Sequence, residues 1–450
     1  MKTSIHTFLI LCIGLLQISC AQEKEKNSIV QKFPFTDVNW SILDKEGVSQ
    51  PMDTTLYDNI MALHLPVGHA AYLKNQKFKN FIVEFDVVGF VMPGLGFRLQ
   101  DKDNYELIYL RVNSSTKKDA LQYIPIDNGN LPWQLYNYPK YEAKAEFAKE
   151  KVTSLPLSFQ EYFKQGIIND SLRSKLEEQD IVFSKEAQVN PINGETWGIG
   201  DIGKLMGLEF RKTTSNWEVW NPYVWTHVKI VVNEDQASVY VKDMSIPKME
   251  IKNLKRNAQM GGICLKNQFF DAFFTDISIV KIKEENKSVI NSDKETFPDN
   301  YLKNWEISPK FTKNVDKIMS QLDSIQTSGV SWQNVNSDED GLLNISRFVK
   351  EMSGTVGLKS VIQSTSNQRV KMGFGFAKNM IVVLNNEIIF SGDMDTSKEE
   401  GRVFVNDESV ELILSKGKNE LIVLVTGDEE YKQNWGFIAR LDNMEGISFK

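Results

Sequence analysis

Apolar and polar residues alternate with a period of two along many short segments between about residues 33 and 282. In the segment 81–87, every second residue is apolar, so four apolar side chains fall on one face of an extended chain. Turn residues separate such segments, as at Asp101–Asn104 between 96–100 and 105–111, and at 233–235 between 225–232 and 236–242. Short strands joined by tight turns are typical of antiparallel β-sandwiches. The pattern predicts one sandwich over residues 33–283.

Residues from about 140 to 205 interrupt this alternation. Helix-forming residues recur there at helical spacing, in the segments 141–151, 158–164 and 171–178. They predict a helical insertion in the first sandwich. A long excursion of this kind is often functional. The insertion could form a lid or rim over a binding face, or it could be an addition to the sandwich that has no role in ligand binding.

A polar, charged segment at 284–297 has the composition of a linker. After a predicted helix at 314–322, the chain to residue 450 is again rich in strand patterns. They fall at 357–362, 380–384, 387–390, 409–414, 421–425 and 435–440. This density of strands predicts a C-terminal jelly-roll β-sandwich over 298–450. The expected fold class is therefore all-β, with two sandwiches and one helical insertion.

The N-terminus has the features of an export signal. Lys2 precedes an apolar stretch at 8–16 that is too short to span a bilayer. Ser19-Cys20-Ala21 fits cleavage before Gln22 by an ordinary signal peptidase, which would leave a periplasmic or secreted protein. It also resembles a lipobox, although Gln17 stands where leucine is usual, and Cys20 would then carry the lipid anchor of an outer-membrane or cell-surface lipoprotein. We expect a signal peptide over 1–21 and a polar tether over 22–32.

Composition narrows the class of protein. The 450 residues include 52 Lys and Arg against 59 Asp and Glu, a net charge of −7, and 11% are aromatic. These values indicate a globular chain of two or three domains and argue against a nucleic-acid partner, which would require a basic surface. Three cysteines, Cys12, Cys20 and Cys264, are too few for a disulfide framework or a cysteine-rich zinc site.

The first unit resembles the concanavalin A/laminin-G class, and more narrowly the secreted bacterial domains of the 3-keto-disaccharide hydrolase type. The resemblance lies in the segments 81–86, 94–105, 122–133, 225–230 and 239–241. The second unit resembles galactose-binding-like jelly rolls over 382–388, 412–421 and 435–441. Together with export, these resemblances imply a surface protein of a polysaccharide-utilisation system, with a polysaccharide or oligosaccharide as its partner.

Familiar catalytic patterns are absent from the sequence. Glycosidases of the concanavalin-like class carry three alternating carboxylates on one strand, whereas here Glu84 and Asp86 are followed by Val88 and Gly89. We therefore expect Glu84 and Asp86 to form a solvated strand face. The sequence has no H-E-x-x-H or G-x-S-x-G motif, and the G-x-G-x-x-G at 198–203 does not follow a strand of a βαβ unit. Catalytic residues stay unassigned.

A polar strand face is the better candidate for a site. Alternation places Arg98 and Gln100 on the strand face opposite Phe97 and Leu99. In the same way it places Tyr109 with Arg111, and Glu209 with Arg211, on an outward face. Arginine, glutamine, tyrosine and carboxylate groups suit sugar hydroxyls, and loop aromatics could stack on sugar rings. The same side chains could instead form a cross-strand network that stabilises the sandwich. The candidates are Arg98, Gln100, Tyr109, Arg111, Trp133, Tyr136, Glu209 and Arg211.

Calcium is the one cofactor that the sequence suggests. Asp101, Asp103 and Asn104 could ligate it, as in some laminin-G-like domains, but the same residue types also form hairpin turns and the EF-hand spacing is not met.

Three functions remain open from the sequence. The leading hypothesis is a cell-surface glycan-binding lipoprotein. The alternatives are a glycoside hydrolase of the 3-keto-disaccharide type, with Arg98, Gln100, Arg111 and Glu209 around an oxidised sugar, and a scaffold lipoprotein without catalysis. The first two require the polar strand face to be open to solvent.

Overall fold

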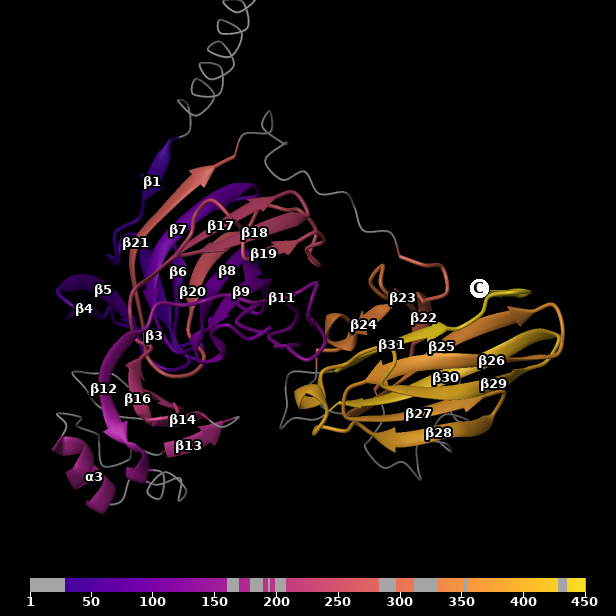
Figure 1. The fold of residues 1–450 in the computed structure, drawn as a ribbon. Helices are drawn as coiled ribbons and strands as arrows, with labels where there is room; N and C mark the ends of the chain where they lie inside the picture. The colour runs from indigo at the N-terminus through magenta and orange to yellow at the C-terminus, as the bar shows by residue number, and fades with distance from the viewer. Residues whose placement is uncertain are drawn as a thin grey trace, which may run out of the picture.

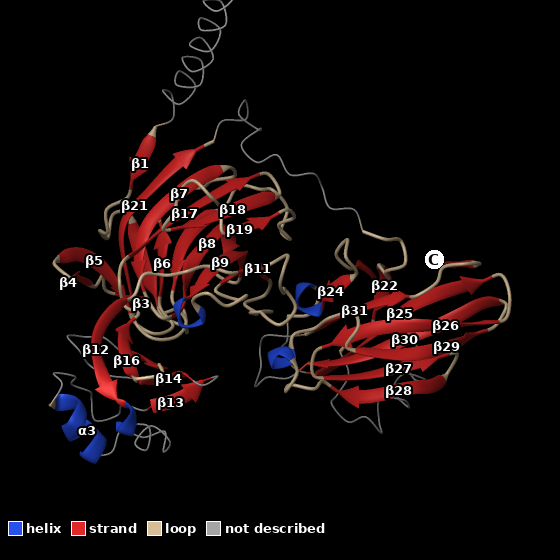
Figure 2. Ribbon diagram, viewed as in Figure 1, coloured by secondary structure: helices blue, strands red, loops and turns tan. Residues whose placement is uncertain are grey.

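A computed structural model gives the fold of the protein (Figure 1). It describes residues 29–159, 170–178, 189–192, 195–198, 208–282, 297–310, 331–350, 354–427 and 435–449. The predicted signal peptide with Cys20, most of the tether and linker, and the predicted helix at 314–322 lie outside these residues. Strands dominate throughout, and two antiparallel β-sandwiches lie side by side (Figure 2). No helix among the described residues combines the length and the apolar character needed to cross a membrane.

The first sandwich consists of two eight-stranded antiparallel sheets. The first sheet has the order β19 (Met249–Ile251), β18 (Gln236–Val241), β17 (Thr226–Asn233), β7 (Phe81–Val88), β21 (Ala272–Lys281), β5 (Ile60–Leu65) and β4 (Thr54–Tyr57), with β1 (Val30–Lys32) also paired to β21. The second sheet has the order β11 (Glu142–Ala143), β10 (Leu121–Ile126), β9 (Asn104–Arg111), β8 (Val91–Asp101), β20 (Gly262–Lys266), β6 (Ala70–Leu73), β2 (Trp40–Leu43) and β3 (Ser49–Gln50).

The alternation seen in the sequence determines which side chains enter this core. Phe81, Val83 and Phe85 of β7 are fully buried, and the residues between them are partly exposed. The hairpins β8–β9 and β17–β18 form at the predicted turns. The last three residues of the predicted tether, Val30–Lys32, form a strand that pairs with β21.

In its described residues, the insertion contains a small sheet and one α-helix, rather than helices alone. Its strands are β12 (Glu150–Pro156), β16 (Asn216–Asn221), β15 (Leu208–Lys212), β14 (Glu195–Gly198) and β13 (Val189–Ile192), in that order, and α3 (Asp170–Glu177) accompanies them. The helix predicted at 171–178 is confirmed. The helix predicted at 141–151 is wrong, since this segment contributes to β11 and β12, where pairing partners outweigh the helical propensity of its residues.

The second unit is a two-sheet antiparallel sandwich of the jelly-roll type. One sheet has the order β23 (Gln333–Asn336), β22 (Asn304–Ile307), β25 (Gly354–Ser364), β30 (Gly417–Gly427), β27 (Asn379–Leu384) and β28 (Glu387–Asp393), with β32 (Ile447–Phe449) on β25. The other has the order β24 (Leu342–Asn344), β31 (Gly436–Leu441), β26 (Gln368–Phe376) and β29 (Glu408–Leu414). Short 3₁₀ turns occur at Val112–Ser114, Leu157–Phe159, Ile345–Arg347 and Glu399–Gly401.

The two units share buried surface. The main hydrophobic core of the first sandwich includes Leu342, Ala377 and Val403 of the second unit. They pack beyond the second sheet, on the side away from the first sheet. We call that side of the second sheet its outer face.

Candidate functional site

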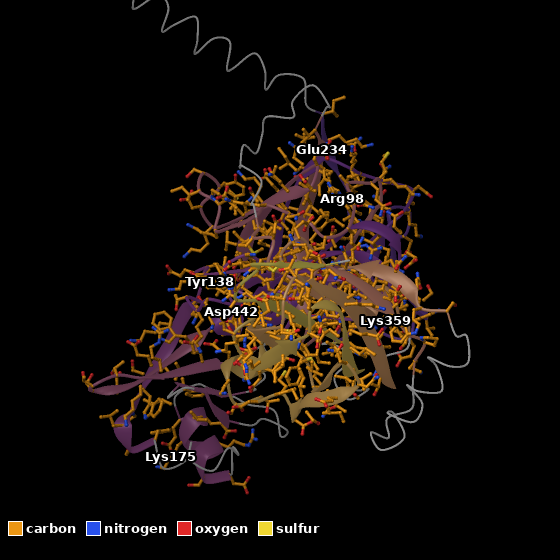
Figure 3. All side chains as sticks on the ribbon, turned by 90° about the vertical axis from the view of Figure 1, so that its right-hand side faces the viewer. Arg98, Tyr138, Lys175, Glu234, Lys359 and Asp442 are labelled. Atoms are coloured by element: carbon orange, nitrogen blue, oxygen red, sulfur yellow. The ribbon has the colours of Figure 1, made fainter. Side chains whose placement is uncertain are left out.

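Arg98 does not lie on the outer face. Its backbone has a φ of 53°, and the pairing of β8 with β9 shifts register between Phe97 and Asp101. This bulge breaks the alternation on which the prediction rested. The guanidinium donates to the carbonyl oxygens of Lys79 and Glu234, and only 1% of Arg98 is exposed (Figure 3). Arg98 therefore ties the end of β8 to loops of the first sheet, and the predicted sugar contact is wrong for this residue. Gln100 beside it is exposed and donates to the carbonyls of Arg98 and Met260.

Tyr109 and Arg111 do share the outer face, as alternation predicts. Arg111 donates to the hydroxyl of Tyr109 at 3.1 Å, to Oε1 of Gln122 at 2.9 Å and to Oδ2 of Asp119 at 2.7 Å. The Tyr109 hydroxyl in turn donates to Gln122. These side chains are a cross-strand network, the second of the two interpretations that the sequence left open.

This end of the outer face is closed. The side-chain amide of Gln122 donates to the carbonyls of Trp133 at 2.8 Å and Tyr136 at 2.7 Å, which holds the loop before β11 over the network. Tyr136 is fully buried, and Arg347 of the second unit donates to its hydroxyl at 2.9 Å. The guanidinium of Arg402, also from the second unit, lies 5.2 Å from the centre of the Trp133 ring. The expectation of an open face is thus wrong for Tyr109, Arg111 and Tyr136, because the second unit covers them.

Glu209 and Arg211 lie elsewhere again, on β15 of the small inserted sheet. Glu209 is buried and pairs with Lys149, and Arg211 donates to it at 3.1 Å. α3 of the same insertion, marked by Lys175, lies at the opposite end of the molecule from Arg98 (Figure 3). The eight candidates therefore do not converge on one site.

The other end of the same outer face remains open and forms a groove of about 520 Å³. Its floor comes from strands β6, β20 and β9, and its rims from the loops that follow β2, β5, β8, β10 and β20. Polar and charged groups line most of it. The lining residues are Leu43, Asp44, Lys45, Glu46, Gly47, Gly68, Ala70, Tyr72, Lys102, Asp103, Tyr105, Gly129, Leu131, Lys266 and Gln268.

A close approach between strands shapes the floor. A Cβ on Gly96 would lie 2.6 Å from the sulfur of Cys264 and 3.0 Å from the ring of Tyr105, so only glycine fits there. Tyr105 is buried in the floor, whereas Tyr72 on β6 is partly exposed. Lys266 extends its ammonium group over Tyr105, 5.7 Å from the ring centre. Burial raises the pKa of Cys264 to about 12, so its thiol stays protonated beneath the groove.

Most of the ionic groups on the rim already have partners. The carboxylate of Asp44 accepts from the backbone N–H groups of Val48 at 2.8 Å and Glu46 at 3.0 Å, and these bonds lower its pKa, the one to Val48 most. Lys45 pairs with Glu46 at 3.6 Å, and Lys102 pairs with Asp103 at 3.9 Å.

The calcium candidates form a hairpin turn. Oδ1 of Asp101 accepts from the backbone N–H of Asp103 at 2.8 Å and from the amide of Asn104 at 3.0 Å. Of the three, Asp103 also lines the groove. Within the described parts of the chain, no group of three or more histidine, cysteine and acidic residues is arranged to hold a metal ion.

Glu84 and Asp86 lie on the outer side of the first sheet, away from the groove. His227 on the neighbouring strand contacts Asp86 at 2.6 Å and Glu84 at 3.2 Å, and the three side chains are between 31% and 41% exposed. The prediction of a solvated strand face is confirmed for this pair.

Tyr72 and Lys266 are two of the groove residues that sequence reasoning missed. Alternation could have found both, since Tyr72 lies between the core residues Ala71 and Leu73, and Lys266 follows the core residue Leu265. The signal is weak because each of these strands is only four or five residues long.

No family model matches the sequence, and no curated protein matches it either. Solved structures with similarity to the chain include a carbohydrate-binding module from Bacillus subtilis, at 11% identity over 55% of this chain and 99% of that one, with a TM-score of 0.29. Domain 4 of an extracellular arabinanase from Geobacillus stearothermophilus, solved with arabinotriose, matches at 9% identity over 56% and 93%, with a TM-score of 0.26. A protein with a galectin-like fold from Bacillus subtilis matches at 9% over 56% and 96%, with a TM-score of 0.22.

Proposed function

We propose that the protein binds a polysaccharide or oligosaccharide in the groove formed by β6, β20 and β9. The observation that carries this proposal is that one end of the outer face is open while the other end is covered by the second unit. The groove volume of 520 Å³ falls within the range of about 300–1,000 Å³ typical of ligand sites, which is room for a short stretch of sugar rings.

The chemistry of the lining supports a saccharide. Charged and amide side chains on the rims, such as Lys102, Asp103 and Gln268, offer hydrogen bonds to hydroxyl groups. Tyr72 offers a partly exposed ring to the C–H face of a sugar.

The second unit supports one wall of this groove. Gly129 and Leu131 line it and belong to the segment that the second unit contacts. Asn128 donates to the carbonyl of Ser346 at 2.7 Å, and the N–H of Val403 donates to the carbonyl of Gln134 at 2.9 Å. In this proposal the first unit is a concanavalin A/laminin-G-like domain of the 3-keto-disaccharide hydrolase type. The second is a galactose-binding-like domain whose role is to position the groove wall.

The proposal also includes a location at the cell surface, through lipid attached to Cys20. The support is the sequence Ser19-Cys20-Ala21 after a short apolar stretch, followed by a charged segment. Fractionation of cells that express the full chain tests it. The wild type is expected with the membranes, and Cys20→Ala in the soluble fraction. A soluble wild type would instead indicate cleavage before Gln22.

Affinity electrophoresis of the protein through gels that contain a panel of polysaccharides tests glycan binding. We expect at least one glycan to retard the wild type and Tyr72→Ala to abolish that retardation. Tyr240→Ala is the matched control, because Tyr240 is a partly exposed tyrosine on the outer side of the first sheet, away from the groove. A wild type that no glycan retards, or equal loss in the two variants, would contradict the proposal.

A further inference from the structure

We propose that the groove selects saccharides that carry an anionic substituent, a uronate carboxylate or a sulfate ester, and that the ammonium group of Lys266 binds this anion. The inference rests on the proposed function and specifies its ligand class. Its starting point is the contrast between Lys266 and the other ionic groups of the groove.

Lys266 is the last residue of β20, paired with Ala70 of β6 and Gly94 of β8, so it lies within the sheet and not on a loop. Its side chain is partly buried, and the ring of Tyr105 lies beneath its ammonium group. In the described part of the chain, no carboxylate forms an ion pair with Lys266 and no acceptor receives a hydrogen bond from it. All three N–H donors of the ammonium group are therefore available to a ligand.

The remaining charges of the groove differ from Lys266 in this respect. Asp44 is held by the backbone of its own turn, and the rim lysines Lys45 and Lys102 each have a carboxylate beside them. An anion that displaced the carboxylate beside Lys45 or Lys102 would leave that carboxylate without its partner, so the net gain would be small. An anion placed over the groove floor meets a cation that has no anion of its own. Such charge-assisted hydrogen bonds are among the strongest that a polar site makes.

A second lysine–tyrosine pair in the same sandwich provides a comparison, because its lysine has a hydrogen-bond acceptor. Lys229 of β17 lies 4.1 Å from the ring centre of Tyr240, and its ammonium group donates to the carbonyl of Met244. Lys229 therefore has a structural role. Lys266 also lies over a tyrosine ring, but it has no backbone acceptor among the described residues and it lines the groove.

The attraction must be local. The whole chain has a net charge of −7, which repels an anionic glycan at long range. Discrimination in favour of an acidic sugar would therefore come from short-range contact in the groove, and salt would weaken it. This makes ionic strength a second readout of the same contact.

The test is isothermal titration calorimetry on the full-length protein with matched oligosaccharides. One pair is a uronate oligosaccharide and its carboxyl-reduced form, and the other is a sulfated oligosaccharide and its desulfated form. The expected result is at least tenfold tighter binding of one acidic member than of its neutral form in low salt, the size of one charge-assisted hydrogen bond. The pair that shows the difference identifies the anion.

Variants then assign the effect to Lys266. Lys266→Gln is expected to remove the preference for the acidic member, and Lys266→Arg is expected to retain the preference because it keeps the charge. Lys229→Gln, on the other sheet, is the matched control and should keep it too. Circular dichroism confirms that each variant folds.

Equal affinity of the wild type for the acidic and neutral members would overturn the inference and leave glycan binding intact. A preference that survives in Lys266→Gln would also overturn it. Failure of the wild type to bind any saccharide, charged or neutral, would overturn the proposed function and this inference with it.

Discussion

The guanidinium of Arg402 in the second unit forms a buried ion pair with the carboxylate of Glu142 in the first. Nε donates to the two carboxylate oxygens at 3.1 and 3.2 Å, and Nη2 donates to Oε1 at 2.9 Å. Both side chains are almost completely buried, with 2% and 0% of their surface exposed. Burial lowers the pKa of Arg402, but attraction from the carboxylate outweighs it and the net direction is upward. The pair joins the two sandwiches at the covered end of the outer face.

Arg402→Ala is expected to destabilise the protein by about 3–5 kcal/mol, because the variant leaves the Glu142 carboxylate buried without its partner. Thermal and urea unfolding of the full chain measure the change. Arg369→Ala is the matched control, since Arg369 pairs with Glu411 at 2.6 Å with both side chains more than half exposed. Its cost should stay under about 1 kcal/mol. Comparable losses in the two variants would show that the buried pair is not a joint between the units.

Glu106 should make stability depend on pH. This fully buried carboxyl accepts from the Tyr123 hydroxyl at 2.6 Å and from the backbone N–H of Arg256 at 2.9 Å. Burial raises its pKa from 4.5 to about 7, although the hydrogen bond from Tyr123 opposes the shift. Between these two values the folded protein keeps a proton that the unfolded chain has lost. Stability from this group is therefore fully present below about pH 4.5 and is lost as pH rises to about 7.

The slope in that window is at most about 1.4 kcal/mol per pH unit for one group. We expect Glu106→Gln to flatten the dependence of the melting temperature on pH between 5 and 7, because the amide does not titrate. A wild-type profile that rises through this window and is unchanged in Glu106→Gln would contradict the assignment.

His64 is expected to titrate above the ordinary histidine pKa of about 6.5. Its ring contacts Asp271 at 2.9 Å and Asp53 at 2.6 Å and stacks on Phe273. The contact with Asp271 is the main cause of the raised pKa, and burial opposes it. The stabilisation is present below the pKa of the unfolded state and is lost as pH rises through the folded pKa.

Histidine-selective NMR titration measures this pKa directly. Asp271→Asn should lower the pKa of His64 more than Asp53→Asn does, because Asp271 contributes the largest shift. A larger decrease in Asp53→Asn would mean that the more exposed Asp53 makes the main contribution to the raised pKa of His64.

Gly96→Ala should destabilise the protein by about 1–3 kcal/mol, because the added methyl group collides with Cys264 and with the ring of Tyr105 in the groove floor. Gly262→Ala on the adjacent strand is the matched control, since its nearest neighbour would be the Cβ of Leu99 at an ordinary 3.5 Å. Unfolding by urea compares the two variants. Equal stability would show that the floor can relax around a methyl group.

The outer face of the second sheet serves two purposes. At the end formed by β9, β10 and β11, Arg111 and Gln122 hold a loop in place, and Arg347 of the second unit donates to Tyr136 of that loop. At the end formed by β6, β20 and β9, Tyr72 and Lys266 face a cavity. The second unit thereby fixes the boundary of the groove while leaving it open.

The sequence by itself determined the all-β class, both hairpins of the first sandwich and the shared direction of Tyr109 and Arg111. These are local consequences of alternation, and alternation is visible wherever a strand runs straight for several residues. It also predicted the solvated face at Glu84 and Asp86. The same reasoning failed for Arg98, because a bulge with positive φ turns that side chain away from the outer face.

Only the tertiary structure decided which part of the outer face stays open. Arg402 and Arg347 come from segments more than 200 residues away from the loop they cover. Strand periodicity reports which side of a sheet a side chain faces, but it carries no information about what packs on that side. Burial depends on contacts between segments distant in the sequence, and these form only when both sandwiches have folded. That is why a polar strand face predicted as a binding surface is, in the folded protein, half interface and half groove.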